Sequence, residues 1–389
     1  MQTTRIDETL SAAVERADVP GVVGMATTRS EIVYQGAFGR RALPDGDPMT
    51  SDTVFWIASM TKAITSMAAM QLVEQGKLAL DEPVAGVLPE LSAPQVLTGF
   101  SPSGEPQLRP AKASITLRHL LTHTSGFVYD IWNAEMGRYM ETKSIPGIIS
   151  CQNAALALPL VFDPGDRWDY GIGIDWAGKA IERVSGQKLD DFFDEHLFGP
   201  IGMRDTAFKL TAERSRARLA GMHARGEDGV LAPMEFEVPQ EPEFQMGGGG
   251  LYGTASDYLA FQRAILNEGR VNGRSVLKPE TVRLMTANAI GDVNVQPLNT
   301  AVPQFSNDAE FFPGTVKKWS LGFMISTQPV SGGRRSGSLA WAGLGNTYFW
   351  IDPGSGIAGV ILMQLLPFAD RKALALLDEF EKAVYAALA

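Results

Sequence analysis

The sequence predicts an α+β fold in which an antiparallel sheet is built from both ends of the chain, flanked by helices and interrupted by a mostly helical insertion. Two β-branched runs, 22–28 and 32–38, stand near the N-terminus, and strand-like runs 348–352 and 357–366 stand near the C-terminus. The long region between them mixes helical segments with Pro/Gly-rich connections. Strands at both ends with helices between them favour one sheet shared by the termini.

The first 80 residues contain signals for a helix, a hairpin and a second, longer helix. Residues 8–18 read as a short amphipathic helix ended by Val19-Pro20-Gly21, and the polar residues 29–31 join the first two strands as a hairpin. Apolar residues recur at helical spacing from 60 to 77, where Gly76 marks the expected end.

A last helix is expected over 370–388, with one apolar face. That face is predicted to consist of Leu374, Leu377, Phe380 and Val384. We expect residues 1–80 and 300–389 to form the α/β domain that carries the sheet, and residues 81–299 to form the inserted helical region.

Composition excludes several classes of function. The 389 residues include 34 Lys+Arg and 44 Asp+Glu, a net charge of −10, without a basic run that could neutralise a polyanion. The single cysteine, Cys151, excludes an internal disulfide framework and a Cys-rich metal site. The charged first residues do not resemble a signal peptide, and no apolar run reaches 18 residues. We therefore expect a cytoplasmic protein that binds neither nucleic acid nor membrane.

The pattern Ser-x-x-Lys is a compact signature of a serine nucleophile, and it occurs three times, at Ser59, Ser185 and Ser275. Ser185 precedes a glycine that ends a helix, and Ser275 lies in a loop or strand where residues i and i+3 diverge. Ser59 opens a long helix, where Lys62 shares its face. A desolvated lysine there can act as a base, although Ser59 as a helix cap beside a solvated lysine remains an alternative.

The residues around Ser59 resemble a known family. The segment Phe55-Trp56-Ile57-Ala58-Ser59-Met60-Thr61-Lys62 resembles the nucleophile segment of serine β-lactamases and penicillin-binding proteins. More narrowly it is similar to the class C β-lactamase-like esterases, or family VIII carboxylesterases. Other matching segments occur in the expected order: Ile115 to Gly126, Pro164-Gly165, Trp168-Asp169-Tyr170, Ile181 to Gly186, Pro200 to Met203, Gly248 to Tyr252 and Trp341-Ala342-Gly343.

The resemblance implies a catalytic cleft between the sheet domain and the helical region, and assigns roles there. Ser59 would be the acylated nucleophile, Lys62 the neighbouring base, and Tyr170 a phenol that moves a proton between nucleophile and leaving group. We expect the ammonium of Lys62 to tune the pKa of Tyr170 toward neutrality. Ile172 stands where β-lactamases have an Asn that contacts the substrate amide, so amide recognition is in doubt.

The third family motif is Lys-Thr/Ser-Gly in β-lactamases and Trp341-Ala342-Gly343 here. The esterases share this departure. The segment is expected to run as an edge strand along the cleft, with Trp341 as a wall rather than a core residue. The backbone N–H groups of Ser59 and Leu344 are the expected oxyanion-hole donors.

Two other patterns carry less weight. His119 and His123 are four residues apart but lack the intervening glutamate of a zinc helix, so no metal site is expected. Residues 248–253 fit G-x-G-x-x-G, yet no strand precedes them and no carboxylate follows at the required distance. A glycine bend at the cleft rim is the favoured interpretation, and no cofactor is expected.

The leading hypothesis is a serine carboxylesterase that cleaves small neutral esters through a Ser59 acyl-enzyme, with acyl transfer to alcohols as a related activity. One alternative is a β-lactamase or D-Ala-D-Ala carboxypeptidase of the same fold. Another is a catalytically silent ligand-binding protein. The sequence does not predict the natural ester or the oligomeric state, and it does not decide whether Lys62 or Tyr170 takes the serine proton.

Overall fold

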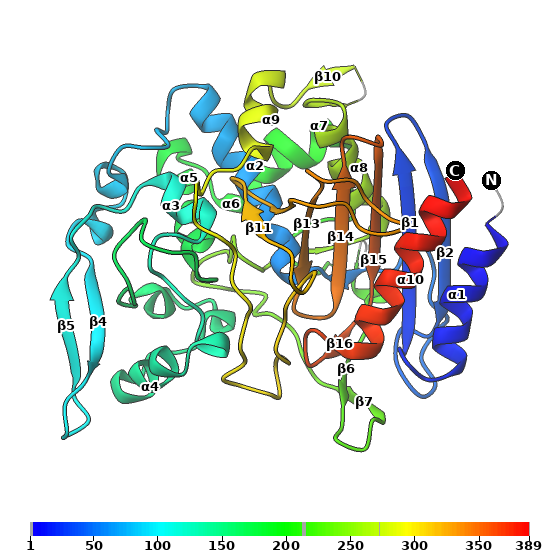
Figure 1. Ribbon diagram of the computed structural model, residues 1–389, viewed down its shortest axis with the longest axis horizontal. Coiled ribbons are helices and arrows are strands. Elements are labelled where there is room, and N and C mark those ends of the chain that lie inside the picture. Colours follow the sequence, from blue (N-terminus) through cyan, green and yellow to red (C-terminus); the bar gives the residue numbers. More distant parts are fainter. Residues whose placement is uncertain (1–2, 212–214, 272, 389) are drawn as a thin grey trace.

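The computed structural model describes residues 3–211, 215–271 and 273–388, and a seven-stranded antiparallel sheet lies at its centre (Figure 1). Two strands come from the N-terminal end and five from the C-terminal end, which confirms the predicted α+β arrangement. In spatial order the strands are β11 (Lys317–Trp319), β12 (Met324–Ser326), β13 (Leu339–Gly343), β14 (Thr347–Asp352), β15 (Ile357–Leu362), β1 (Gly21–Thr28) and β2 (Ile32–Gly39).

The two faces of the sheet are covered by different helices. α1 (Thr4–Glu15) and α10 (Arg371–Leu388) pack on each other and cover one face, where Trp350 meets Phe380 of α10 (Figure 1). On the other face α8 (Ala255–Leu266) packs against β1, β14 and β15, and its Tyr258 meets Phe349. Neighbouring residues of β14 thus serve opposite faces, as strand alternation requires.

The expected helix boundaries and faces need correction. α1 begins and ends earlier than 8–18, and the helix expected over 60–77 is α2 (Thr61–Glu74). In α10 the residues buried in the core include Leu376, Phe380 and Val384, whereas Leu374 and Leu377 are only half-buried. Asp370 fixes the helix start because its side chain accepts hydrogen bonds from the N–H groups of residues 372 and 373. With α10 starting at this position, the side chains of Leu374 and Leu377 point partly away from the sheet.

The middle of the chain is built from short helices and small hairpins. The helices are α3 (Leu117–Thr122), α4 (Ala134–Lys143), α5 (Gly173–Ser185), α6 (Leu189–Phe193), α7 (Gly199–Ile201) and α9 (Pro279–Thr286). The small strand pairs are β3 (Phe55–Trp56) with β8 (Tyr252–Gly253), β4 (Gln95–Phe100) with β5 (Pro106–Pro110), β6 (Met222–Arg225) with β7 (Leu231–Met234), and β9 (Arg270–Val271) with β10 (Arg274–Ser275). The domain boundaries expected near residues 80 and 300 stay a prediction. Within the expected inserted region, α8 packs on the central sheet.

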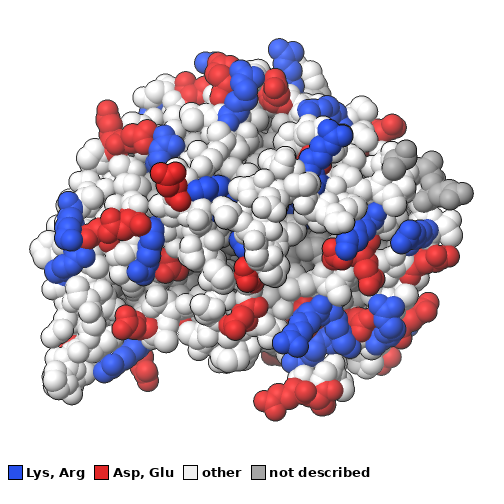
Figure 2. Space-filling view, viewed as in Figure 1, with Lys and Arg blue, Asp and Glu red and all other residues white. Residues whose placement is uncertain are grey.

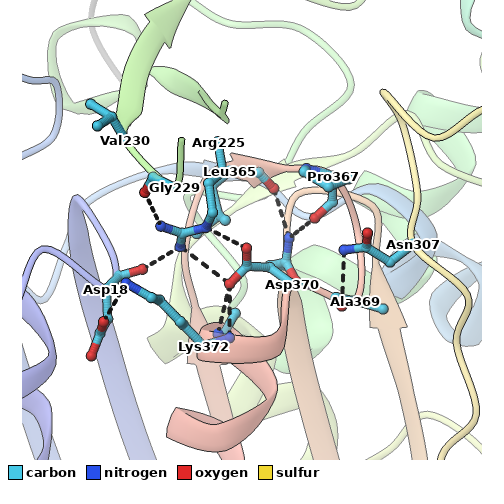
Figure 3. A network of polar contacts seen from close by, with 12 residues as sticks. Asp18, Arg225, Gly229, Val230, Asn307, Leu365, Pro367, Ala369, Asp370 and Lys372 are labelled. Atoms are coloured by element: carbon cyan, nitrogen blue, oxygen red, sulfur yellow. Dashed lines mark hydrogen bonds and ion pairs between the residues drawn. The ribbon is translucent and has the colours of Figure 1, made fainter. Parts of the chain in front are cut away.

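The strand expected over 357–366 stops at Leu362. The chain then forms β16 (Leu365–Leu366), which pairs in parallel with β6. A polar network fixes the segment that follows, because Arg225 of β6 lies between Asp370 and the carbonyl oxygen of Asp18 and donates to both (Figure 3). Asn307 joins this segment from another part of the chain by donating to the carbonyl oxygen of Ala369 (Figure 3).

Charged side chains of both signs are interspersed on the face of the molecule shown in Figure 2. No helix within the described residues is long and apolar enough to cross a membrane. The cytoplasmic location stays a prediction.

Candidate active site

Ser59 lies in a 3₁₀ turn, Ala58–Met60, that leads directly into α2. The turn follows β3, whose pairing with β8 holds it in place, and the N–H of Ile57 donates to the carbonyl of Leu251. Ala58 has φ of +44°, a left-handed conformation that is costly for a residue with a side chain. Strain of this kind beside a reactive serine is typical of a functional turn.

Lys62 is buried with its amino group against Ser59. Its exposed fraction is 1%, and Nζ lies 3.1 Å from Ser59 Oγ. Nζ also donates to the Tyr129 hydroxyl at 2.9 Å and to the Gly248 carbonyl oxygen at 2.6 Å. A neutral amine has two N–H bonds and one lone pair, so the two oxygen acceptors leave the lone pair for the Ser59 hydroxyl. The contacts therefore suit a base.

Burial lowers the pKa of Lys62 to about 7, and the negative charge of Asp175 opposes this shift. Asp175 is fully buried, and its own pKa is raised to about 6, chiefly by burial. One Asp175 oxygen accepts from the N–H of Gly248 at 2.8 Å. Asp175 therefore holds Gly248, the residue whose carbonyl binds Lys62, and also acts on the lysine through its charge.

Tyr170 also lies beside Ser59. Its hydroxyl accepts a hydrogen bond from Trp341 Nε1 at 3.0 Å, and the Lys62 amino group lies 4.8 Å from its ring centre. Burial raises the pKa of Tyr170, and interactions with the hydroxyl of Ser59 and the N–H of Trp341 only partly offset this. The expectation that this pKa is tuned toward neutrality is wrong. Of Lys62 and Tyr170, only Lys62 has a pKa near neutrality.

Sequence reasoning missed Tyr129 and Asp175. Tyr129 comes just after the matched segment that ends at Gly126, and nothing in its spacing relates it to a lysine 67 residues away. Asp175 had a visible signal, because it is a carboxylate between Ile174 and Trp176 in an otherwise apolar helix start. A buried carboxylate needs a partner.

Two small hollows open beside Ser59. The first, here the Trp56 hollow, has a volume of about 40 Å³ and is lined chiefly by Trp56, Ser59, Tyr129, Ile149, Met246 and Leu344. The second, the Trp341 hollow, has a volume of about 10 Å³ and is lined chiefly by Ser59, Trp132, Tyr170, Trp341, Leu344 and Phe368.

The third motif borders the second hollow as expected. Trp341, Ala342 and Gly343 all line the Trp341 hollow. β13 is not at the edge of the sheet, but β12 pairs only with Leu339 and Ala340, so this part of β13 is free on the cleft side. A Cβ on Gly343 would come within 2.3 Å of the Ile57 carbonyl oxygen, so glycine allows β13 to approach the Ser59 turn.

Leu344 and Ser59 line the same hollows, as an oxyanion hole formed by their N–H groups requires. That assignment stays a prediction. Ile172 is 1% exposed at the start of α5, and other residues line both hollows. The structure thus does not bring Ile172 to the cleft as expected.

The two histidines lie outside any metal cluster. His119 forms a capping box with Thr116 at the start of α3, and His123 packs among Trp168, Tyr170 and Trp319. No group of three His, Cys, Asp or Glu side chains suited to a metal occurs among the described residues. Gly248 and Gly249 line the Trp56 hollow and form a rim of the site.

A serine on a strained turn, a buried lysine against its hydroxyl and a tyrosine beside it define an enzyme of the serine hydrolase and acyltransferase class. A profile of the Beta-lactamase family matches residues 6–381, and the chain belongs to that family.

Relatives and solved structures support this class. The ML-236A carboxylate methylbutanoyltransferase of Penicillium citrinum is 34% identical over 98% of this chain and 93% of its own length. The lovastatin esterase of Penicillium rubens is 33% identical over 92% of both chains. The LovD9 variant of simvastatin synthase from Aspergillus terreus has a similar structure, with a TM-score of 0.86 and 33% identity over 99% of both chains.

Proposed function

We propose that this protein is a serine carboxylesterase, of the family VIII type, that cleaves neutral esters through a Ser59 acyl-enzyme and passes the acyl group to water or an alcohol. The observation that carries this proposal is the 3.1 Å contact between Ser59 Oγ and the buried amino group of Lys62. With a pKa of about 7, that amino group is substantially neutral at physiological pH and can accept the serine proton.

The reaction can be followed through the named groups. Ser59 Oγ attacks the ester carbonyl as Lys62 takes its proton, and the N–H groups of Ser59 and Leu344 would stabilise the oxyanion. Tyr170 remains a protonated phenol because burial raises its pKa, and it donates a proton to the departing alkoxide oxygen. Lys62 returns its proton to the Tyr170 oxygen, which restores both groups. Water or an alcohol then attacks the acyl-enzyme by the reverse sequence.

The position of Tyr170, the proton donor, indicates which hollow holds the alcohol portion of the ester and which holds the acyl portion. The leaving oxygen must lie beside Tyr170, which lines the Trp341 hollow but not the Trp56 hollow. The alcohol portion therefore lies toward Trp341, and the acyl portion lies toward Trp56. At about 40 Å³ the acyl side has room for a few heavy atoms, which favours a short acyl group.

Neutral substrates fit the cleft because no lysine or arginine is among the residues lining either hollow. Arg334 and Arg335 offer no replacement for the missing motif lysine. Arg334 is 3% exposed and bound to Glu381, and Arg335 donates to the Gly354 carbonyl oxygen. A substrate carboxylate next to Trp341 would lose hydration without gaining a cation, which costs several kcal/mol.

The relatives support both halves of the proposal, since one is a methylbutanoyltransferase and another an esterase. The alternative β-lactamase or peptidase activity would need recognition of a carboxylate near the scissile bond. A silent binding protein would not need a base buried against the serine.

The test compares kcat/KM for p-nitrophenyl butyrate and for the cephalosporin nitrocefin on one preparation. At about 1.4 kcal/mol per tenfold, a penalty of about 3 kcal/mol predicts more than a hundredfold preference for the butyrate. Addition of an alcohol should divert part of the butyryl group into a new ester. Comparable values, or a preference for nitrocefin, would overturn the esterase proposal.

A further inference from the structure

His123 is a buried histidine that the proposed reaction does not use, and it lies against Tyr170. Its side chain is 1% exposed, and it ends α3 with φ of +58°, a left-handed conformation in which histidine is one of the few enriched residues. The centre of its ring lies 4.7 Å from that of the Tyr170 phenol, with 58° between the two planes. A polar ring enclosed beside a reactive phenol calls for an explanation.

His123 binds the chain on both sides of Tyr170. Its carbonyl oxygen accepts from the N–H of Asp169 at 2.9 Å, and its Nδ1 accepts from the N–H of Gly171 at 3.4 Å. The carbonyl oxygen of Tyr170 accepts from the N–H of Tyr129 at 3.1 Å. One residue, His123, thus holds both the residue before Tyr170 and the residue after it.

The segment that His123 holds is closely packed. A Cβ at Gly171 would lie 2.1 Å from the carbonyl oxygen of Phe127, so this glycine passes directly against the backbone of another segment. Tyr170 itself is 2% exposed. A general acid must keep its hydroxyl within hydrogen-bond reach of the reacting oxygens. A displacement of this segment would therefore move the phenol out of its working position.

The contacts of His123 require a neutral ring with its proton on Nε2. Nδ1 is an acceptor toward Gly171, which leaves the proton to Nε2. Nε2 has no hydrogen-bond partner among the described residues, and the rings of Tyr170 and Trp319 lie 4.7 and 4.9 Å from the imidazole. The faces of aromatic rings are weak acceptors for an N–H.

The charges around His123 also favour the neutral ring. Burial lowers the pKa of His123 well below its usual range, and the positive charge of Lys62 lowers it further. The titratable groups that face the ring are Lys62 from α2 and Tyr170 from the segment after α4. The lone pair of Nδ1 is used by Gly171, and the Nε2 proton is enclosed among rings. His123 therefore takes no part in proton transfer itself.

We infer that His123 is a positioning residue, which holds Tyr170 toward Ser59 through the hydrogen bonds from Asp169 and Gly171. This inference rests on the proposed function and extends it, because that reaction needs Tyr170 as its proton donor. His123 is not among the residues that line the two hollows, so it does not contact the substrate. Its contribution is therefore expected in kcat and not in KM.

The experiment replaces His123 by residues that keep different parts of the ring. His123→Asn keeps an acceptor near the position of Nδ1, and asparagine also tolerates a positive φ. His123→Gln places its amide near the position of Nε2 instead, and His123→Leu keeps neither group. His119→Leu is the matched control, because His119 caps the same helix and lines neither hollow. Thermal melting shows whether each variant is folded.

With p-nitrophenyl butyrate, His123→Leu and His123→Gln should lower kcat about ten- to a hundredfold, since a displacement of about 1 Å can cost about 10²-fold. KM should change little. His123→Asn should recover most of the loss, and His119→Leu should keep the wild-type kcat. Recovery by glutamine equal to that by asparagine would overturn the inference.

A double-variant comparison tests whether His123 acts through the phenol. In a Tyr170→Phe background, His123→Leu should have almost no further effect on kcat, because the hydroxyl that His123 positions is already gone. A purely structural role of His123 would lower kcat by the same factor in both backgrounds. That result would also overturn the inference.

A second measurement does not depend on the activity of a variant. The protein contains four histidines, so the ¹⁵N signals of the wild-type histidine rings can be compared with those of His123→Asn. At about pH 6, below the usual pKa of histidine, His123 should still give the signals of a neutral ring with its proton on Nε2. An imidazolium, or a proton on Nδ1, would contradict the contact with Gly171.

The outcomes separate this inference from the proposed function. If the wild-type protein does not hydrolyse p-nitrophenyl butyrate, the proposed function is overturned and this inference falls with it. If the wild-type protein is active and a folded His123→Leu protein has an unchanged kcat, this inference alone is overturned.

Discussion

The carboxylate of Asp175 accepts the N–H of Gly248 at 2.8 Å, and the carbonyl of the same Gly248 accepts the amino group of Lys62 at 2.6 Å. One residue, Gly248, thus connects a buried acid to a buried base through its two successive peptide groups. The space is fully used, because a Cβ on Gly248 would lie 2.5 Å from Asp175 Oδ2. Asp175 is a positioning residue in this arrangement, since it reaches Ser59 only through Lys62.

Asp175→Asn should shift the acid limb of the kcat–pH profile to lower pH. The Asp175 charge raises the pKa of Lys62, so its removal lowers that pKa, and the lysine stays neutral in more acidic solution. The asparagine oxygen can still accept the Gly248 N–H. The other titratable groups that face Lys62 are Tyr129, Tyr170 and His123, whose side chains are unchanged.

The wild-type profile should rise through about pH 7, the pKa of Lys62. An acid limb in Asp175→Asn that coincides with the wild-type limb would mean that Asp175 has only a structural role. Asp175→Ala, which also removes the acceptor for Gly248, is the comparison variant and should in addition lower kcat.

Lys62 and Tyr170 should act as one proton-transfer unit. Either Lys62→Ala or Tyr170→Phe should lower kcat by about 10²–10⁴, the range for loss of a general acid or base. The double variant should lose little more, because groups that act together are strongly non-additive. Stopped-flow measurement of p-nitrophenol release gives all three values. If the loss of kcat in the double variant equals the product of the two single losses, the two residues act independently and the shared function is refuted.

Trp341→Phe should separate the two roles of this indole. Phenylalanine retains an apolar wall but lacks the N–H that donates to the Tyr170 hydroxyl at 3.0 Å. A hydrogen bond of this kind is worth about 0.5–1.5 kcal/mol, so kcat should fall roughly two- to thirteenfold while KM changes little. A change in KM without a change in kcat would mean that Trp341 only forms a wall of the cleft and does not assist Tyr170.

Gly343→Ala should destabilise the fold around the nucleophile. The added methyl group would lie 2.3 Å from the carbonyl oxygen of Ile57, which is backbone and has little freedom to move. Overpacking of this kind costs about 1–3 kcal/mol and should appear as a lower melting temperature with loss of activity. Gly86→Ala is the matched control, since nothing lies within 4 Å of a Cβ at Gly86. Equal melting temperatures for the two variants would contradict the close approach.

The fold was predictable from particular segments. The hairpin β1–β2 agrees closely with the expected runs 22–28 and 32–38 because a β-branched run bounded by turn residues is a local signal. The face of α10 was predicted less well. Leu374 and Leu377 fit the helical period as well as Leu376 does, and only the cap at Asp370 and the position of the sheet decide which of them is buried.

Some residues of the candidate site could likewise be predicted from local sequence and others could not. Ser59 and Lys62 lie one helical turn apart, so their contact is local and follows once the segment is expected to be helical. Tyr129 and Asp175 reach Lys62 only through the packing of distant segments, and no periodicity encodes that contact. The pKa of Tyr170 was misjudged because the sequence indicates a neighbouring ammonium but not how completely the phenol is buried.

The most direct test of the account is the identity of the acylated residue. The protein is mixed with p-nitrophenyl butyrate, quenched in acid within the first turnover, and digested for peptide mass analysis, with Ser59→Ala as the control. We expect one butyryl group on the peptide that contains Ser59, and neither label nor turnover in a folded Ser59→Ala protein. A butyryl group on Ser185, Ser275 or any other residue, or turnover that survives in Ser59→Ala, would contradict it.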